Sequence, residues 1–210
     1  MIGLIVSGGD RVNDNLLKNY SSKADFIIAV DKGAESLIAN NIKIDLLVGD
    51  FDSISEKSLN ILKERKTSIK KLEIEKDESD TEAALNYLIK NNYSKIFMLN
   101  CTGSRLDHTI SNIFLLKKLL DDNIEAYLLD NNNRVRMINS KARIKKEYEN
   151  ISIIPLTVDG INISLEGFYY KLSNEEIEYG SSRCISNFLI NDFGNVIINS
   201  GLALIIESND

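Results

Sequence analysis

The chain has 210 residues, of which 43% are hydrophobic and 27% charged, as expected for one large globular domain or a core domain with a smaller partner. Its formal net charge is −6, and no long run of Lys and Arg is present. Nucleic-acid binders and proteins that dock on anionic membranes need clustered basic residues, so the sequence argues against both classes.

The apolar runs are much shorter than the roughly 20 residues that a membrane helix needs. The residues after Met1 do not form a basic segment followed by a long apolar run, so we expect no signal peptide. The two cysteines, Cys101 and Cys184, lack CxxC spacing, which argues against a zinc site and a disulfide scaffold. We therefore expect reduced thiols and a cytoplasmic protein.

Strand-like and helix-like segments alternate through the first part of the chain. Short apolar runs predict strands at residues 3–7, 26–30, 45–50, 69–74, 95–100 and 126–130. Helical spacing predicts helices at residues 34–41, 55–65, 79–91 and 106–120. This alternation indicates a three-layer α/β domain with a mostly parallel sheet.

Two of these helices carry further signals. Ser79 and Glu82 have the spacing of a capping box, which marks the start of the third helix. The fourth helix is strongly indicated, because its apolar residues fall near helical spacing: Leu106, Ile110, Ile113, Phe114 and Leu120.

The pattern changes in the last part of the chain. Short β-rich segments separated by Gly, Asn and Asp predict an antiparallel β-sandwich. We therefore divide the chain into an α/β domain, residues 1–133, and a β-sandwich domain, residues 134–210. No Pro- or Gly-rich linker marks the joint.

Polar residues cluster directly after several predicted strands. Asp31 follows the second strand, Asp50 and Asp52 follow the third, and the segment from Asn100 to Arg105 follows the fifth. In open parallel sheets ligands bind at the carboxyl ends of the strands, so these groups are expected at one rim.

The pair Asp50 and Asp52 is the clearest candidate for a metal site. In an extended segment the two carboxylates point to the same side and repel each other unless a cation lies between them. Oxygen ligands of this kind suit Mg²⁺, which takes one or two carboxylates plus substrate phosphates. A solvated turn is the alternative interpretation.

The acidic stretch from Glu75 to Glu82 also has two interpretations. Helix capping and the helix dipole account for Ser79 and Glu82. Asp77 and Asp80 add like charge, which a metal or a cationic substrate would offset.

A loop containing Gly103 opens the fourth helix and offers backbone N–H groups to an anion. Arg105 adds a guanidinium suited to phosphate oxygens. Asp107 is either a first-turn carboxylate or a partner that orients Arg105. His108, the only histidine, is either a packing or capping residue or a ligand contact. The turn around Gly8 and Gly9 matches neither the dinucleotide fingerprint nor the P-loop.

Taken in order, the motifs resemble those of the thiamine pyrophosphokinase family: SGGD, VDKGAESL, IDLLVGDFDSI, EKDESDTEAAL, TGSRLDHTISNI, GFYYKL and YGSSRCISN. The resemblance covers nearly the whole chain. It implies an ATP-binding catalytic domain, a β-sandwich that binds thiamine and dimerises, and a homodimer with thiamine sites between subunits. It also implies the reaction, in which ATP and thiamine give thiamine diphosphate and AMP with Mg²⁺.

The resemblance assigns roles to residues by motif. It implies a metal and catalytic set of Asp50, Asp52, Asp77 and Asp80, joined in catalysis by Arg105. It implies an ATP-binding set of Gly8, Gly9, Asp31, Lys32, Thr102, Arg105, Asp107 and His108. It implies a thiamine-binding set of Asp80, Thr81, Ser186 and Asn187. Asp80 or Asp77 would orient the substrate hydroxyl or accept its proton, and the choice between them stays open.

The chain departs from the family pattern at three points. Lys32 stands where the family usually has Gly, Phe188 stands where bacterial members often have Glu, and no tryptophan is present to stack on thiamine. The aromatic residues Tyr169, Tyr170, Tyr179 and Phe188 are candidates for a thiamine surface, although we expect most of them in the sandwich core. Alternatives are a pyrophosphokinase for a hydroxymethylpterin, a non-catalytic nucleotide or thiamine sensor, and a DxD glycosyltransferase.

Overall fold

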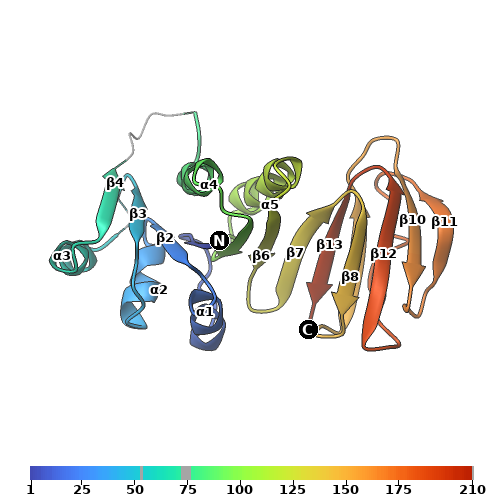
Figure 1. Ribbon diagram of the computed structural model, residues 1–210, viewed down its shortest axis with the longest axis horizontal. Helices are drawn as coiled ribbons and strands as arrows, with labels where there is room; N and C mark the ends of the chain where they lie inside the picture. The colour runs from blue at the N-terminus through green and yellow to red at the C-terminus, as the bar shows by residue number, and fades with distance from the viewer. Residues whose placement is uncertain (53, 72–76, 210) are drawn as a thin grey trace. The chain divides into compact units, whose positions relative to one another are not determined.

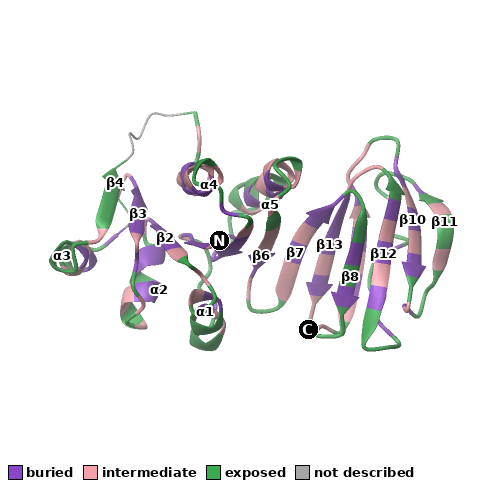
Figure 2. Ribbon diagram, in the orientation of Figure 1, coloured by how far each residue is buried: buried purple, intermediate pink, exposed green. Residues whose placement is uncertain are grey.

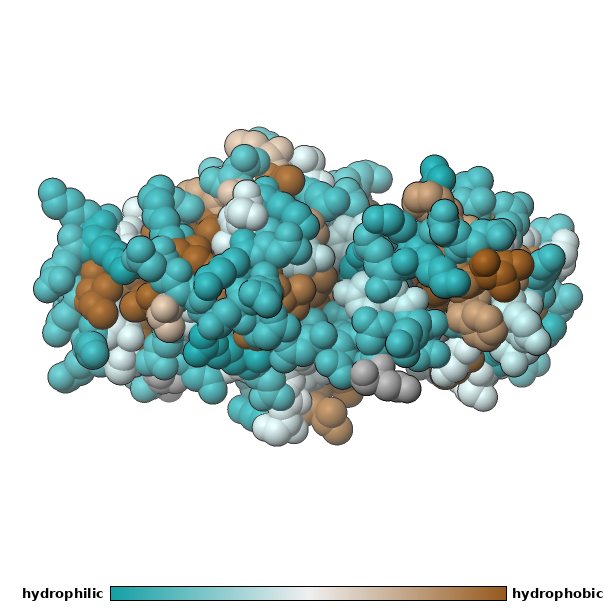
Figure 3. Space-filling model, turned by 90° about the horizontal axis from the view of Figure 1, so that it is seen from below, coloured by the Kyte–Doolittle hydropathy of each residue, from teal (hydrophilic) through white to brown (hydrophobic). Residues whose placement is uncertain are grey.

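The computed structural model describes residues 1–52, 54–71 and 77–209 and contains two compact units, Met1–Asn131 and Asn132–Asp210 (Figure 1). None of the helices in these ranges has both the length and the hydrophobicity to cross a bilayer. Hydrophilic side chains cover most of the face drawn in Figure 3.

The N-terminal unit is built on parallel strands in the order β4-β3-β2-β1-β5-β6. They are β1 (Ile2–Val6), β2 (Phe26–Val30), β3 (Leu46–Gly49), β4 (Ser68–Lys71), β5 (Lys95–Leu99) and β6 (Glu125–Leu129). The chain builds outward from β1 to β4 and then returns to the other side of β1. The strand order therefore reverses between β1 and β5, the position at which open α/β sheets bind ligands.

Helices cover both faces of this sheet, which confirms the predicted three-layer fold (Figure 1). On one face lie α1 (Asp14–Ser21), α2 (Gly33–Ala39) and α3 (Glu56–Glu64), and on the other α4 (Asp80–Lys90) and α5 (Leu106–Asp121). Leu17, Leu37 and Leu62 pack from the first group onto the sheet. Leu88 of α4 contacts the opposite face at Gly3.

Local signals explain where the helices start. The Ser79 hydroxyl accepts a hydrogen bond from the N–H of Glu82 at 3.2 Å, as the capping spacing predicts. Helix α1 was not among the predicted elements, although Asn13 caps it by accepting from the N–H of Leu16 at 2.9 Å. Asn13 followed by Asp14 was the available signal.

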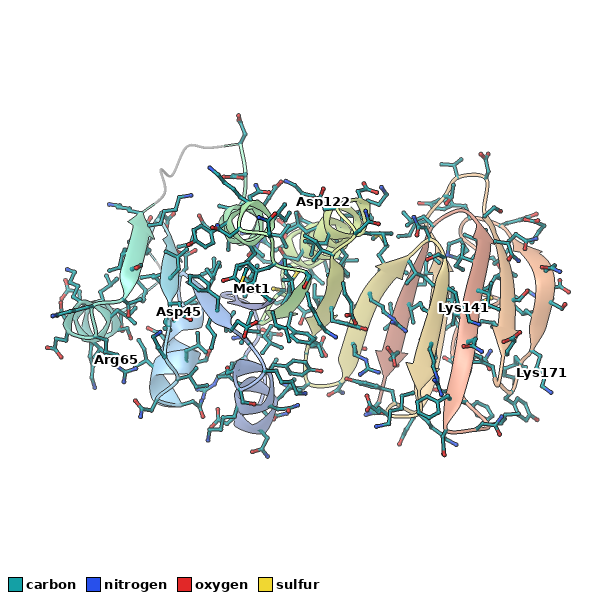
Figure 4. All side chains as sticks on the ribbon, viewed as in Figure 1. Met1, Asp45, Arg65, Asp122, Lys141 and Lys171 are labelled. Atoms are coloured by element: carbon teal, nitrogen blue, oxygen red, sulfur yellow. The ribbon has the colours of Figure 1, made fainter. Side chains whose placement is uncertain are left out.

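Helix α5 confirms the predicted helix, but several apolar residues of the predictive pattern lie on its exposed side. Leu106, Ile110 and Phe114 are 69%, 50% and 56% exposed, and the helix buries Asn112, Leu116 and Leu119 instead. Leucines and isoleucines occur around this helix, so spacing alone does not reveal which side faces the sheet. The helix is followed by the C-cap residue Asp122, labelled in Figure 4.

The C-terminal unit consists of antiparallel strands in two layers. In one layer β13 (Ala203–Ser208) pairs with β7 (Asn133–Ile138) and β9 (Asn150–Pro155). The other has the order β11-β10-β12-β8 and contains β8 (Lys141–Lys145), β10 (Ile161–Glu166), β11 (Leu172–Ile177) and β12 (Phe193–Ser200).

Alternate residues of these strands are buried, as a sandwich core requires (Figure 2). Ile153 of β9 and Ile163 of β10 belong to the same buried cluster. The antiparallel C-terminal fold is thus confirmed.

The expected burial of the aromatic residues is wrong. Tyr169, Tyr170 and Tyr179 are 58–60% exposed and Phe188 is 39% exposed. They lie outside the strands, and Phe168 fills the core position beside them with no exposed surface.

A buried ion pair joins β7 to β13. The Arg134 guanidinium donates to both carboxylate oxygens of Glu207, at 3.0 and 2.6 Å, and to Glu147 at 2.8 Å. Glu207 is only 1% exposed. Burial by itself would lower the pKa of Arg134, but the hydrogen bonds to Glu207 and Glu147 raise it above its ordinary value.

Candidate functional site

The loops after β1 and β5 fit closely together. The N–H of Gly9 donates to the Asn100 carbonyl and the N–H of Asp10 donates to the Thr102 carbonyl, both at 2.8 Å. A Cβ atom on Gly9 would lie 2.2 Å from the Thr102 oxygen. Glycine is therefore required at this close approach.

A cavity of about 530 Å³ opens at this point, outside the carboxyl ends of β1, β2 and β5. It is bordered by the start of α4 and the first turns of α5. Several residues singled out from the sequence line it: Gly8, Gly9, Asp31, Lys32, Asp80, Thr81, Thr102, Arg105 and His108. The groups predicted after the second and fifth strands thus line a single pocket of the size that small-molecule ligands occupy, whereas Asp50 and Asp52 after the third strand are not part of its lining.

Asp31 lies against the end of β3. The N–H of Phe51 donates to its Oδ1 atom at 3.3 Å. Gly49 has a φ of +147°, and a Cβ there would lie 1.8 Å from the same oxygen. Only glycine at position 49 leaves room for this carboxyl.

The pKa of Asp31 is raised from 3.8 to about 7. Burial is the largest cause, followed by repulsion from Asp80 and a hydrogen bond with it, with Asp50 adding further repulsion. Asp31, Asp50 and Asp80 therefore form one carboxyl cluster, which we call the acidic cluster. Its electrostatics favour either a retained proton or a bound cation.

Asp50 and Asp52 do not lie in an extended segment as expected. Strand β3 ends at Gly49, and Phe51 has a φ of +70° in the turn that follows. The N–H of Asp52 donates to Asp50 Oδ1 at 3.0 Å. Asp50 is half-buried, whereas Asp52 and Asp77 are exposed and, like Asp50, are not part of the cavity lining that the structure describes.

Within the described ranges, no three metal-ligating side chains are grouped closely enough to hold an ion by themselves. The chemistry of the acidic cluster nevertheless fits Mg²⁺. This ion keeps several waters and is commonly held by one or two carboxylates together with substrate phosphates.

The opposite wall of the cavity favours anions. Helix α5 starts after Arg105 without a side-chain cap, so its first N–H groups can meet a ligand. Arg105 donates to Asp107 at 2.6 and 3.3 Å. This hydrogen bond lowers the pKa of Asp107 and raises that of Arg105, which favours the interpretation that Asp107 orients the guanidinium.

Two further cationic or titratable groups border the pocket. The aliphatic stem of Lys32 lies over Gly8, with its Cγ atom 3.2 Å from where a Cβ on that glycine would be. His108 is exposed, and its Nε2 atom lies 4.0 Å from Asp107. Both residues line the cavity.

The predicted thiamine residues of the C-terminal unit differ in character. Asn187 is buried, and its carboxamide donates to the Tyr170 carbonyl at 2.8 Å and accepts from the Tyr170 N–H at 3.1 Å. Its side chain therefore holds a loop. Ser186 is exposed and has a left-handed φ of 57°.

An aromatic cluster lies next to these residues. The rings of Tyr169 and Phe188 stack with centroids 4.7 Å apart and an interplanar angle of 19°, and Tyr170 meets Tyr169 edge-on at 5.0 Å. Tyr169 and Tyr170 also border a cavity of about 380 Å³ with Asn187.

Other cavity residues were not singled out from the sequence. Ser7, Cys101 and Asn112 line the pocket from its buried side. Asn112 lies four and seven positions before Leu116 and Leu119, the buried leucines of α5, but spacing alone did not mark this side of the helix as the buried one. Ser7 precedes Gly8 and Gly9, and no sequence pattern marked it as a site residue.

Two family models match the chain. The catalytic domain of thiamin pyrophosphokinase matches residues 17–128, and the vitamin B1 binding domain of thiamin pyrophosphokinase matches residues 139–203. The thiamine pyrophosphokinase of Bacillus subtilis (strain 168) is 34% identical over 209 residues, which cover 98% of each chain.

Solved structures agree with this match. The crystal structure of the Bacillus subtilis thiamine pyrophosphokinase has a TM-score of 0.93 at 33% identity, with both chains covered completely. That of the Geobacillus thermodenitrificans thiamin pyrophosphokinase has a TM-score of 0.90 at 29% identity, covering 100% of this chain and 98% of the other. The family indicated by the motifs is confirmed: this chain belongs to the thiamin pyrophosphokinases, a family of ATP-dependent pyrophosphoryl transferases.

Proposed function

We propose that this chain transfers the β,γ-pyrophosphoryl group of Mg-ATP to the hydroxyl of thiamine at the cavity beside β1 and β5, giving thiamine diphosphate and AMP. One observation carries the assignment to this cavity. Two members of the acidic cluster, Asp31 and Asp80, line the same pocket as Arg105 and the start of α5. A site with carboxylates on one wall and phosphate donors on the other suits a metal-bound nucleotide.

The metal would be held by the carboxylates after β3 and at the start of α4. Asp50 and Asp80 are the central ligands in this proposal, with Asp52 and Asp77 assigned by motif. When bound, Mg²⁺ supplies positive charge that turns repulsion between the carboxylates and the phosphates into attraction.

The nucleotide phosphates would lie along the glycine turn and the start of α5. Gly8, Gly9 and Thr102 allow the backbone to approach the phosphates closely. Arg105, oriented by Asp107, and Lys32 would offset charge on the transferred group, with His108 at the rim.

In the reaction the thiamine oxygen forms a bond to the β-phosphorus, and the bond from that phosphorus to the α-phosphate oxygen breaks. AMP leaves with the electron pair of that bond. The hydroxyl proton passes to a carboxylate, for which Asp80 and Asp77 are the candidates. Positioning and charge stabilisation account for most of the rate in this class of reaction.

Thiamine carries a cationic thiazolium ring, which suits aromatic faces and acidic surroundings. The exposed Tyr169–Phe188 stack supports a role for the C-terminal unit in binding it. Ser186 could contact thiamine directly, and Asn187 would act by holding the loop of Tyr170. We further propose a cytoplasmic homodimer with thiamine between subunits, residues 1–133 as the catalytic domain and residues 134–210 as the thiamine-binding and dimerisation domain.

The proposal is tested by AMP release from ATP with and without thiamine. We expect thiamine-dependent AMP formation that EDTA abolishes and excess Mg²⁺ restores. A hydroxymethylpterin alcohol serves as the alternative acceptor. AMP release with the pterin alone would contradict the assigned substrate, and tight ATP binding without turnover would favour a sensor.

A further inference from the structure

A pair of buried hydroxyls lies beneath the cavity. The Oγ atoms of Ser7 and Thr81 are 2.9 Å apart, and the residues are only 4% and 8% exposed. Ser7 follows β1, and Thr81 is the second residue of α4. The hydrogen bond therefore ties the start of α4 to the central strand of the sheet, across 74 positions of sequence.

This pair continues into a buried polar network. The Ser7 N–H donates to the Leu99 carbonyl at 2.9 Å, and the Cys101 thiol donates to the same carbonyl at 3.4 Å. The Asn112 carboxamide donates to the Cys101 carbonyl at 2.8 Å. Buried polar groups that are mutually satisfied hold the elements that carry them in one arrangement.

The position of Asp80 gives this network a consequence for the site. Asp80 directly precedes Thr81 and lines the cavity together with Asp31, to which it is hydrogen-bonded and whose charge it repels. When both carboxyls are ionised, the repulsion favours movement of the first turn of α4 away from β2. The Ser7–Thr81 bond acts on the same turn and opposes that movement.

We infer that the Ser7–Thr81 hydroxyl pair holds Asp80 beside Asp31 in the geometry that receives the metal-bound nucleotide. Thr81 is then a positioning residue and not the thiamine contact that the motif implied. This inference rests on the proposed function, because it assigns Asp80 to the metal site.

The test measures metal binding directly. Mn²⁺ is titrated into the enzyme with α,β-methylene-ATP, which cannot release AMP, and bound Mn²⁺ is followed by electron paramagnetic resonance. Thr81→Val and Ser7→Ala remove the bond from either side, and Ser7→Ala adds no volume. We expect each to raise the Mn²⁺ concentration at half-saturation about 10-fold, the size of effect that loss of one buried hydrogen bond can produce.

Three further variants separate positioning from simple loss of structure. Thr81→Ser keeps the hydroxyl and should bind Mn²⁺ like the wild type. The double variant should be no weaker than either single one, because both lose the same bond. Ser36→Ala removes another buried hydroxyl, one that bonds only to Gly33 within α2, and should leave Mn²⁺ binding unchanged. Steady-state kinetics should show a lower kcat with an unchanged KM for thiamine.

Specific outcomes would overturn the inference. Additive effects of the two variants, or wild-type Mn²⁺ binding in both, would show that the pair does not position Asp80. A raised KM for thiamine in Thr81→Val alone would make Thr81 a substrate contact. Failure of the wild type itself to bind Mn²⁺ with the nucleotide would overturn the proposed metal site, and the inference with it.

Discussion

The two units differ in how their partly buried charged side chains are compensated. In the C-terminal unit, Arg134 and Glu207 are paired through two hydrogen bonds, and the Arg134 guanidinium also lies 4.9 Å from the Tyr148 ring centroid. In the N-terminal unit, Asp31 is crowded by Asp80 and Asp50, and its pKa rises to about 7. The first arrangement carries its own counter-charge, whereas the second is completed by a proton or a cation.

This difference distinguishes a structural ion pair from a binding site. Charges that are paired within the protein form part of the folded structure. Removing one partner leaves the other buried and unpaired, which destabilises the fold. Like charges gathered at the ends of strands oppose folding and are retained where a ligand offsets them. Mutations in the two clusters should therefore affect different measurements.

The largest expected change in stability comes from the C-terminal unit. Glu207→Gln leaves the Arg134 charge without its buried partner and should lower the free energy of unfolding by about 3 kcal/mol, measured by urea denaturation. Glu147→Gln is the matched control, because Glu147 is 42% exposed in its side chain and its loss should cost less than about 1 kcal/mol. Equal costs would show that burial does not govern this network.

The next effect is on catalysis. Asp50→Asn removes a charge of the acidic cluster and should reduce turnover at least about 100-fold, as expected for loss of one charge-stabilising group. AMP release measures the rate, and circular dichroism should show an intact fold. A rate near that of the wild type would remove Asp50 from the metal site.

The pH dependence of stability should reveal Asp31. Its pKa is raised in the folded state, so its stabilising contribution is complete below pH 4 and is lost as the pH rises through 7. In EDTA, the wild type should lose about 1–2 kcal/mol over this range relative to Asp31→Asn, a small value because the half-buried carboxyl is screened by solvent. Parallel pH profiles of the two proteins would contradict the raised pKa.

The smallest effect is expected at the aromatic cluster. Phe188→Ala removes the ring stacked on Tyr169 and should raise the KM for thiamine about 3- to 10-fold with little change in kcat. Tyr179→Ala is the control, because Tyr179 is about as exposed as Tyr169 and Tyr170 but lies outside the stack. An equal rise in both variants would point to a general loss of aromatic surface.

Local sequence patterns were sufficient to predict much of the fold and the family of this protein. The alternation of strands and helices, the cap at Ser79 and the polar residues after each strand predicted the α/β unit and its ligand-binding rim. Short β-rich segments separated by Gly, Asn and Asp predicted the antiparallel sandwich. The order and spacing of the motifs predicted the family.

Tertiary structure decided what depends on distant neighbours. Spacing could not show that α5 buries Asn112 and exposes Phe114, because both sides of the helix carry apolar residues. It could not reveal the Ser7–Thr81 bond or the approach of Asp80 to Asp31, since these pairs are far apart in sequence. The carboxyls are buried and repel one another only because the sheet brings separate loops to one edge. The charge state of the site therefore depends on the tertiary structure.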